Sequence, residues 1–451
     1  MGMSQDLTRG NITASLLKFA WPFMAGNLLQ QLYNIVDTLI VGKYLGSDAL
    51  AAVGASYTLM TFLTSILLGL CMGSGVVFSI YFGRREPERL KQSVFLSFCM
   101  IAGVTVALNV LVFLLMDPIL ILLQVPQQCY DLMRTYLWVI FWGIAATFLY
   151  NFFACLLRAL GNSAAPLVFL GVSALLNVGL DLLFVLVFRW GVAGAAGATV
   201  LAQYLSGLGL GLYTLLRCPA ARVSRQHMVW DRRAMGEILQ LSSLTCVQQS
   251  VMNFGILMVQ GRVNYFGPAV MAAFAAAVKI DSFAYMPVQD FGNAFSTFIA
   301  QNYGAGETKR IKTGIRSAVR TVFCFCVIIS AAVFLFARPL LGIFIQAGET
   351  EILDIGVRYL RIEGTFYCLI GFLFLCYGYY RAVKKPGMSV VLTVISLGTR
   401  VLLAYTLSAI PVIGVVGIWA SVPIGWFLAD LVGFLYYWKC ESKFRKHRAP
   451  L

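Results

Sequence analysis

Charged residues are scarce in this sequence. Asp, Glu, Lys and Arg make up only 12% of its 451 residues, whereas 60% are hydrophobic. Such a composition excludes an ordinary soluble domain and is typical of a protein with several membrane spans. Histidine is scarcer still: there are two, His227 and His447, and both lie in basic stretches outside the apolar segments. A buried catalytic histidine is therefore excluded, and no paired-aspartate or metal-ligand pattern indicates an enzyme.

Cysteine gives no sign of a disulfide framework or a metal site. The eleven cysteines are an odd number and lie mostly within apolar segments. The pair Cys324-x-Cys326 has no histidine or second cysteine pair nearby, so we interpret these residues as small apolar side chains.

Uncharged stretches that are long enough to cross a bilayer recur along the whole chain. They cover residues 59–82, 94–116, 135–157, 190–216, 238–261, 321–337 and 364–380. Three more carry one buried charge each: 163–188 with Asp181, 386–410 with Arg400 and 411–438 with Asp430. With 19–46 and 270–299 this predicts an all-α polytopic protein of twelve transmembrane helices. The runs are too continuous for an outer-membrane barrel.

The formal net charge of +15 is concentrated in alternate loops. Most of the basic residues fall near 84–91, 158, 217–233, 309–320, 381–385 and 439–448, and the loops between these carry few. By the positive-inside rule, the basic loops and both termini lie in the cytoplasm, which requires an even number of spans. This distribution favours an inner (plasma) membrane protein and excludes nucleic-acid binding as the reason for the charge.

The two halves of the chain repeat one another. Gly46, Phe82-Gly83-x-x-Glu86 and Arg89-Leu90-Lys91 correspond to Gly267, Tyr303-Gly304-x-x-Glu307 and Arg310-Ile311-Lys312 at a constant offset of 221 residues. We therefore predict an N-terminal six-helix lobe over 1–218, a cytoplasmic linker over 219–236, and a C-terminal six-helix lobe with a basic tail over 237–451. Each half begins and ends in the cytoplasm, so the repeat is parallel, as in transporters that open a central cavity to each side in turn.

A polar stripe runs along the first apolar segment. Gln30, Tyr33, Asn34 and Asp37 are spaced so that they share one face of a helix. A carboxylate among lipid-soluble residues costs about 2.5–3.5 kcal/mol at a helix centre, so it normally faces a bundle interior or a watery cavity. The alternative is that Asp37 is hydrated near a helix end, as the nearby Lys43 suggests.

A second polar pair lies in segment 163–188. Asn177 and Asp181 are four residues apart and share a helix face. Convergent carboxylates and an amide offer the hard oxygen ligands that Na⁺ or a carried proton needs, and crowded carboxylates hold a proton more tightly. The alternative is that Asp181 pairs with Arg189 at the extracellular end.

The second half carries different charges. Ala404 and Arg400 stand where the repeat would place Asp181 and Asn177, so the predicted cation site is one-sided. Segment 270–299 contains Lys279, Asp281 and Asp290. These residues either line a cavity, together with Arg400, or Lys279, Asp281 and Arg400 neutralise one another.

Several stretches resemble the multidrug and toxic compound extrusion (MATE) family. They are Pro22 with the Gln30–Asp37 run, Val41-Gly42-Lys43-Tyr44-Leu45-Gly46, Asn177-Val178-Gly179-Leu180-Asp181, and Ala300-Gln301-Asn302-Tyr303-Gly304-Ala305-Gly306. The resemblance covers essentially the whole chain. It implies secondary active export of amphipathic organic cations in exchange for H⁺ or Na⁺, with no cofactor beyond the coupling ion.

The resemblance is nearest to the DinF-like branch, which keeps its cation site in the N-terminal lobe. This implies coupling-ion ligands at Asp37, Asn177, Asp181 and Thr199, with Tyr136 and Asn151 as polar neighbours. The other main branch places acids on helices seven and ten. Here helix seven has none and helix ten has only Glu363, near its start, which argues against a site of that kind. We expect a monomer that contacts small substrates and lipid. The alternative function is a lipid-linked-precursor flippase of the same superfamily, which the cations Lys279 and Arg400 would suit.

Overall fold

The computed structural model describes residues 5–122, 127–345 and 348–446, and these are helical with no strand among them. His447 and the end of the basic tail lie outside these ranges. The α-helices are α1 (Ile12–Leu45), α2 (Ser47–Arg84), α3 (Pro87–Leu114), α4 (Met116–Leu122), α5 (Gln127–Ile140), α6 (Gly143–Ala159), α7 (Ala164–Asp181), α8 (Gly191–Arg217), α9 (Arg232–Asn264), α10 (Pro268–Gly304), α11 (Thr308–Leu341), α12 (Thr350–Thr365), α13 (Tyr367–Ala382), α14 (Pro386–Leu407) and α15 (Val415–Lys446).

The predicted all-helical membrane architecture is confirmed. Among the described residues, eight helices are long and apolar enough to cross a bilayer. Two further spans are broken: α5 and α6 meet at 44°, and α12 and α13 at 51°. The more polar helices α1 and α9, of 34 and 33 residues, are not among these candidate spans, so the number of twelve stays a prediction.

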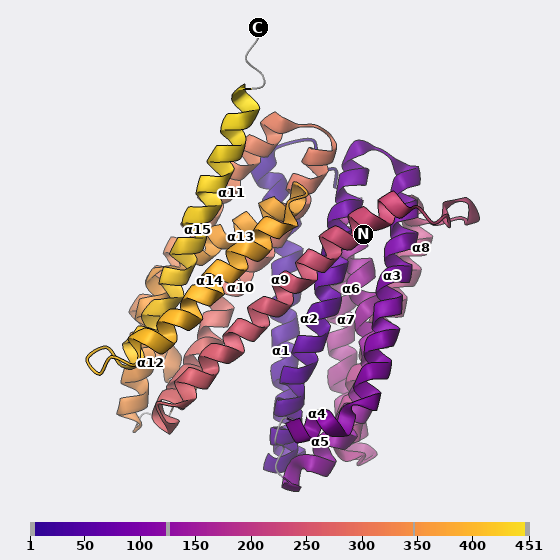
Figure 1. The fold of residues 1–451 in the computed structure, drawn as a ribbon. Coiled ribbons are helices and arrows are strands. Elements are labelled where there is room, and N and C mark those ends of the chain that lie inside the picture. The colour runs from indigo at the N-terminus through magenta and orange to yellow at the C-terminus, as the bar shows by residue number, and fades with distance from the viewer. Residues whose placement is uncertain (1–4, 123–126, 346–347, 447–451) are drawn as a thin grey trace. The chain divides into compact units, whose positions relative to one another are not determined.

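The residues group into two compact units (Figure 1). The first contains residues 1–246 and 300–307, and the second contains 247–299 and 308–451. The long helices α9 and α10 therefore each contribute residues to both units. The division into lobes at residues 218 and 237 stays a prediction.

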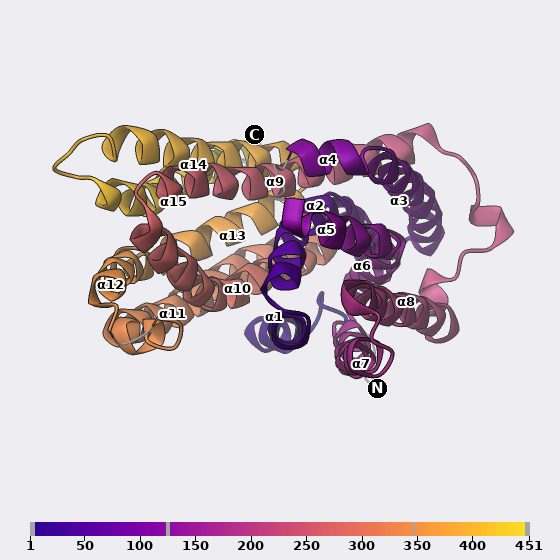
Figure 2. The same ribbon diagram turned by 90° about the horizontal axis from the view of Figure 1, so that it is seen from below.

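Within the first unit, α1 packs against α7 and α2, while α6 packs against α8 and α2. The end-on view shows α5 beside α2 and α6 (Figure 2). Helix α1 begins at the N-cap Asn11, whose side chain accepts the amide hydrogen of Ala14. These contacts bring α1 and α7, which carry the predicted site, together.

One end of the first unit carries Arg84, Arg85, Arg158 and Arg217, and we call it the basic end. Further along α2, in its middle part, this helix approaches α9 so closely that a Cβ on Gly69 or Gly73 would overlap the backbone of Cys246 or Ser242. The hydroxyl groups of Ser74 and Ser242 are hydrogen-bonded at 3.0 Å and are fully buried. Small residues therefore allow two helices to touch along their backbones.

The segment between α8 and α9 is anchored to the basic end through His227. Its imidazole is buried, which corrects the expectation that a histidine in this basic stretch would be exposed, and Nε2 lies 2.7 Å from the Glu88 carboxylate on α3. Nδ1 accepts the backbone amide hydrogen of Ser224 at 3.0 Å. The proton then resides on Nε2 and is donated to Glu88.

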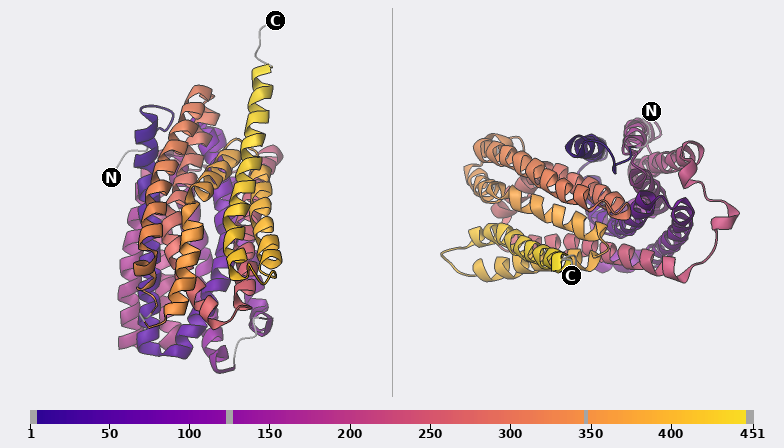
Figure 3. Two further views of the ribbon diagram at one scale, coloured as in Figure 1. Left: turned by 90° about the vertical axis from the view of Figure 1, so that its left-hand side faces the viewer. Right: turned by 90° about the horizontal axis from the view of Figure 1, so that it is seen from above.

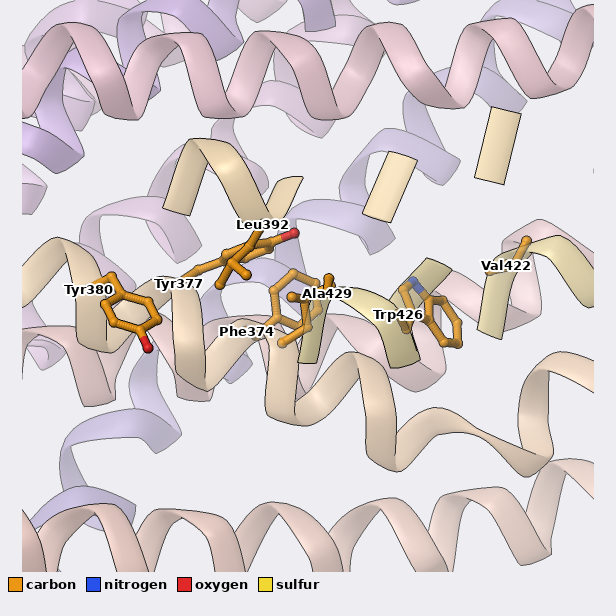
Figure 4. Packing of buried hydrophobic residues seen from close by; sticks show 8 residues of the cluster. Phe374, Tyr377, Tyr380, Leu392, Val422, Trp426 and Ala429 are labelled. Carbon is orange, nitrogen blue, oxygen red and sulfur yellow. The ribbon is translucent and has the colours of Figure 1, made fainter. Parts of the chain in front are cut away.

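The second unit has a core of aromatic and aliphatic side chains from α13, α14 and α15 (Figure 4). Phe374, Tyr377, Leu392 and Trp426 are among its buried members. The C-terminal end of helix α15 extends beyond the first residues of α14 (Figure 3). Asp430 is 3% exposed on α15, and neither carboxylate oxygen has a hydrogen-bond partner within the described part of the chain.

Candidate functional site

Two acids from different helices meet inside the first unit. Asp37 is half-buried on α1, eight residues before that helix ends, and Asp181 is fully buried as the last residue of α7. The two carboxyl groups are close enough to interact electrostatically. The structure thus brings together the two acids that the sequence predicts to form the site.

Asn177, one turn before Asp181 on α7, is hydrogen-bonded to Thr199. The Asn177 amide on α7 donates to the Thr199 hydroxyl on α8 at 3.3 Å. The Thr199 hydroxyl in turn donates to the carbonyl of Ala195 at 3.2 Å. With its NH₂ group engaged in this way, Asn177 has its Oδ1 available as an acceptor.

Several oxygen atoms of the site are buried without a partner. Asp37 Oδ1, Asn177 Oδ1 and both carboxylate oxygens of Asp181 have no hydrogen-bond donor within the described residues. Nor does any described ion pair join Asp181 to Arg189, so the alternative pairing at the helix end is not seen. Buried, unpaired oxygens of this kind are costly unless a proton or a cation joins them.

Two tyrosines lie within electrostatic range of the acids. Tyr136 on α5 is buried and lies within electrostatic range of Asp37, Asp181 and Tyr33. Tyr33 interacts with Gln30, one turn earlier on α1, and with Asp37. Asn34, on the same helix, is half-buried.

Asn151 has a different environment from the one that the resemblance implies. Its amide group donates to the Thr147 carbonyl one turn earlier on α6, at 2.8 Å. Within the described part of the chain, no contact between Asn151 and either acid is seen. Its role as a polar neighbour of the acids therefore stays a prediction.

A backbone irregularity follows directly after Asp181. The chain leaves α7 through a π-helix, Leu182–Val187, before α8 begins. The Phe184 carbonyl in this segment lies against Gly194, where a Cβ would come within 3.1 Å of it. Short π-helical segments often occur at functional sites. The side-chain pattern of this segment does not predict a π-helix.

A second cluster of buried charges lies in the second unit. Asp281 on α10 interacts with Glu363 on α12 and with Arg400 on α14. Glu363 is 1% exposed and accepts a hydrogen bond from the Tyr359 hydroxyl at 2.8 Å, and Tyr367 lies beside Asp281. The cluster therefore contains two acids, one arginine and two tyrosines.

The position of Glu363 corrects the sequence interpretation. It lies three residues before the break between α12 and α13, in the interior of a bent span rather than near its start. The charges of Asp281 and Arg400 do come together, but Glu363 is their third partner. The exposed Lys279 instead lies over the Phe344 ring, 5.8 Å from its centroid. Asp290 is buried further along α10.

Comparison with known proteins gives a consistent result. The family model described as MatE matches residues 22–183 and 242–406. The chain is 31% identical over 446 residues to a probable multidrug resistance protein, YpnP, of Bacillus subtilis, covering 97% of this chain and 98% of that protein. It is 26% identical over 431 residues to a FAD transporter of Shewanella oneidensis, covering 91% and 90%.

The fold also matches a solved structure described as the outward-facing conformation of a multidrug resistance MATE family transporter of the MOP superfamily. The TM-score is 0.91 at 22% identity, with 98% of this chain and 99% of that chain covered. At this identity the similarity establishes the fold alone.

Proposed function

Since the chain belongs to the MATE family of multidrug efflux transporters, we propose that it is a secondary active antiporter that exports amphipathic organic cations in exchange for H⁺ or Na⁺. The observation that carries this proposal is the group of buried, unpartnered oxygens on Asp37, Asn177 and Asp181. They are hard ligands that suit a proton or Na⁺ and offer nothing to a soft metal.

The first step of the mechanism is charge neutralisation. When no ion is bound, the Asp37 and Asp181 carboxylates repel one another and attract a cationic substrate. Binding of a proton or Na⁺ removes the repulsion, because it reduces the negative charge shared by the two groups. The loaded site then no longer holds the substrate cation.

The second step converts this local change into movement. An ion biases a conformational equilibrium only by binding one state better than the other. Helix α1 contains Pro22, and proline weakens the helical hydrogen-bond ladder at its position. Bending there would change the distance from Asp37 to Asp181, so ion binding would favour one shape of α1. Tyr136, next to both acids, is positioned to stabilise the neutralised pair.

The remaining parts of the proposal follow from charge and composition. The basic end and both termini face the cytoplasm, and the membrane is the inner (plasma) membrane. The transporter works as a monomer with no cofactor apart from the coupling ion. Placement in the DinF-like branch is part of the same proposal.

The flippase alternative gains no support from the second unit. A lipid-linked diphosphate would require unpaired basic side chains. Arg400 instead lies among Asp281 and Glu363, and Lys279 is exposed over Phe344. This arrangement leaves no excess of positive charge around Arg400.

Dye efflux from inside-out vesicles tests the proposal. An imposed pH or Na⁺ gradient should drive uptake of a lipophilic fluorescent cation into vesicles that contain the protein, and collapse of the gradient should stop it. A neutral dye of similar size serves as the specificity control, and FAD is a useful anionic probe because one relative is a FAD transporter. A transport rate that depends on neither the pH nor the Na⁺ gradient would contradict the proposal. So would a higher transport rate for FAD than for the cationic dye.

A further inference from the structure

Residues 5–9, which precede α1, are bound tightly to the basic end, and we call them the N-terminal strap. Leu7 has no exposed surface even though it lies outside every helix. Its amide donates to the Gln301 side chain at 3.1 Å, and its carbonyl accepts from the Asn302 amide group at 3.2 Å. Both partners belong to the last turns of α10.

The strap is also joined to α6. The Gln5 amide donates to the carbonyl of Gly161 at 3.0 Å, just after α6 ends. The backbone there adopts a positive φ of 84°, and a Cβ on Gly161 would overlap the Gln5 carbonyl. Only glycine therefore suits this position.

Gln301 connects these two attachments. Its side-chain oxygen accepts from Leu7, while its NH₂ group donates to the carbonyl of Ala159 at 2.8 Å. Gln301 and Asn302 both have no exposed surface. One buried amide, with both its oxygen and its nitrogen hydrogen-bonded, thus connects the strap, the end of α6 and the end of α10.

The helix that the strap holds belongs to both compact units. The last residues of α10 and the three residues that follow it, 300–307 together, belong to the first unit. The preceding part of α10 belongs to the second. In an alternating-access transporter, the helix ends that close one side must separate when that side opens. The strap holds the end of α10 against the end of α6, and all three segments belong to the first unit.

We propose that the N-terminal strap is a latch that stabilises the conformation in which the basic end is closed, with Leu7, Gln301 and Asn302 as its positioning residues. Release of Leu7 from α10 would then be a step in opening this end. The inference rests on the proposed alternating-access function, but its contacts lie away from the ion site. Loosening the latch should therefore raise the population of the open state without changing ion or substrate ligands.

The test uses a reporter cysteine at the contact between α2 and α9. In a background without the native cysteines, Ser74→Cys places a thiol at a position that is fully buried against Ser242. Inside-out vesicles expose the predicted cytoplasmic side to a thiol reagent. Leu7→Asp and Gln301→Met each disrupt the latch. Asp6→Asn is the matched control, because its side chain is exposed on the same segment and an asparagine Oδ1 can still accept the hydrogen bond from the Thr8 amide.

We expect both latch variants to increase the labelling rate of Ser74→Cys by about fivefold or more, the factor that one lost hydrogen bond would give. The Asp6→Asn control should label at the unmodified rate. A separate Leu7→Cys reporter, combined with Gln301→Met, shows whether the strap has left its site. If the thiol of Leu7→Cys becomes accessible to the reagent while that of Ser74→Cys stays protected, the proposal is overturned. The proposal is also overturned if the thiol of Leu7→Cys stays protected in the Gln301→Met variant.

Hydrogen exchange in the wild-type protein gives a test that needs no variant. The strap amides and those at the end of α10 should lose protection together whenever conditions increase labelling at the basic end. Opening with a fully protected strap would contradict the latch. Neither measurement requires coupled transport, so a failure of the antiport proposal would be distinguishable from a failure of the latch.

Discussion

Gly83 on α2 and Gly304 on α10 make equivalent contacts, because each packs against a backbone carbonyl of the other's helix. A Cβ on Gly83 would overlap the carbonyl of Gln301, and a Cβ on Gly304 would overlap the carbonyl of Ile80. Gly304 follows Gly83 by 221 positions, and Gln301 follows Ile80 by the same 221. The repeat in the sequence therefore appears in the structure as a local two-fold contact at the basic end.

This contact makes a prediction about stability. Gly83→Ala should lower the free energy of unfolding by about 1–3 kcal/mol, because the added methyl group has no room against the Gln301 backbone. Thermal unfolding of the purified protein in detergent measures the change. Gly103→Ala on α3 is the control, since a Cβ there meets nothing within 4 Å. Equal melting temperatures for the two variants would refute the close approach of the helices.

The acid pair makes a prediction about coupling. Asp37→Asn and Asp181→Asn should each abolish gradient-driven efflux, because an amide cannot take up a proton or balance the charge of Na⁺. Folding should persist, since removing a buried, unpartnered charge does not remove a stabilising contact. The control is Asp131→Asn, an exposed acid on α5. Near-normal coupled transport by either site variant, measured in inside-out vesicles, would disprove the assignment.

Most of the N-terminal site could be predicted from the sequence, because helical spacing places Asn177 and Asp181 on one face and a carboxylate in an apolar helix is conspicuous. The link from α1 to α7 depended on the family resemblance. The π-helix after Asp181 could not be predicted, because it is a backbone feature without a side-chain signature.

The charged cluster in the second unit, in contrast, could not be fully predicted from the sequence. The sequence alone predicts Glu363 near the start of a span, but in the structure it lies just before the break between α12 and α13, beside Asp281 and Arg400. Contacts among α10, α12 and α14 are long-range, so no local pattern reports them. The burial of Leu7 could not be predicted either, because a single leucine in a polar segment shows no hydrophobic periodicity.

That cluster predicts an unequal response to mutation. Arg400→Met should destabilise the protein by about 3–5 kcal/mol, because it leaves Asp281 and Glu363 buried without a cation. Glu363→Gln keeps the shape and the Asp281–Arg400 pair, so it should be nearly neutral. The double variant should recover part of the loss, and the difference measures the coupling. Additive effects in thermal unfolding would show that the three groups are independent.

The charge distribution predicts the topology. Single cysteines at Arg85 and Lys309, in a background without native cysteines, should resist an impermeant thiol reagent in intact cells, because both lie in basic stretches at helix ends that are predicted to face the cytoplasm. Tyr265→Cys is the positive control: the residue is 74% exposed and follows α9 at the predicted outer side. Labelling of Arg85→Cys from outside would reverse the assigned orientation of the basic end.

The acid pair also predicts competition between the coupling ion and the substrate. If a cationic substrate is attracted by the bare carboxylates of Asp37 and Asp181, a proton or Na⁺ at the same oxygens must weaken its binding. Linkage requires the effect to be reciprocal, so the substrate must also weaken ion binding. Exchange of one proton for one substrate would change the apparent Kd by about tenfold per pH unit while the site is protonated.

Binding of a fluorescent cation to the purified protein measures this competition. Fluorescence anisotropy is recorded first against pH and then against Na⁺ at fixed pH, with K⁺ replacing Na⁺ to hold the ionic strength constant. The ion that weakens binding is the coupling ion. The Asp37→Asn/Asp181→Asn double variant should lose the dependence, and Asp131→Asn should keep it. If the dependence survives in the double variant, the competing groups lie outside this pair, and Asp281 and Glu363 are the next acids to replace. If neither ion affects binding, ion and substrate do not share the N-terminal site, and the charge-neutralisation step proposed for export is wrong.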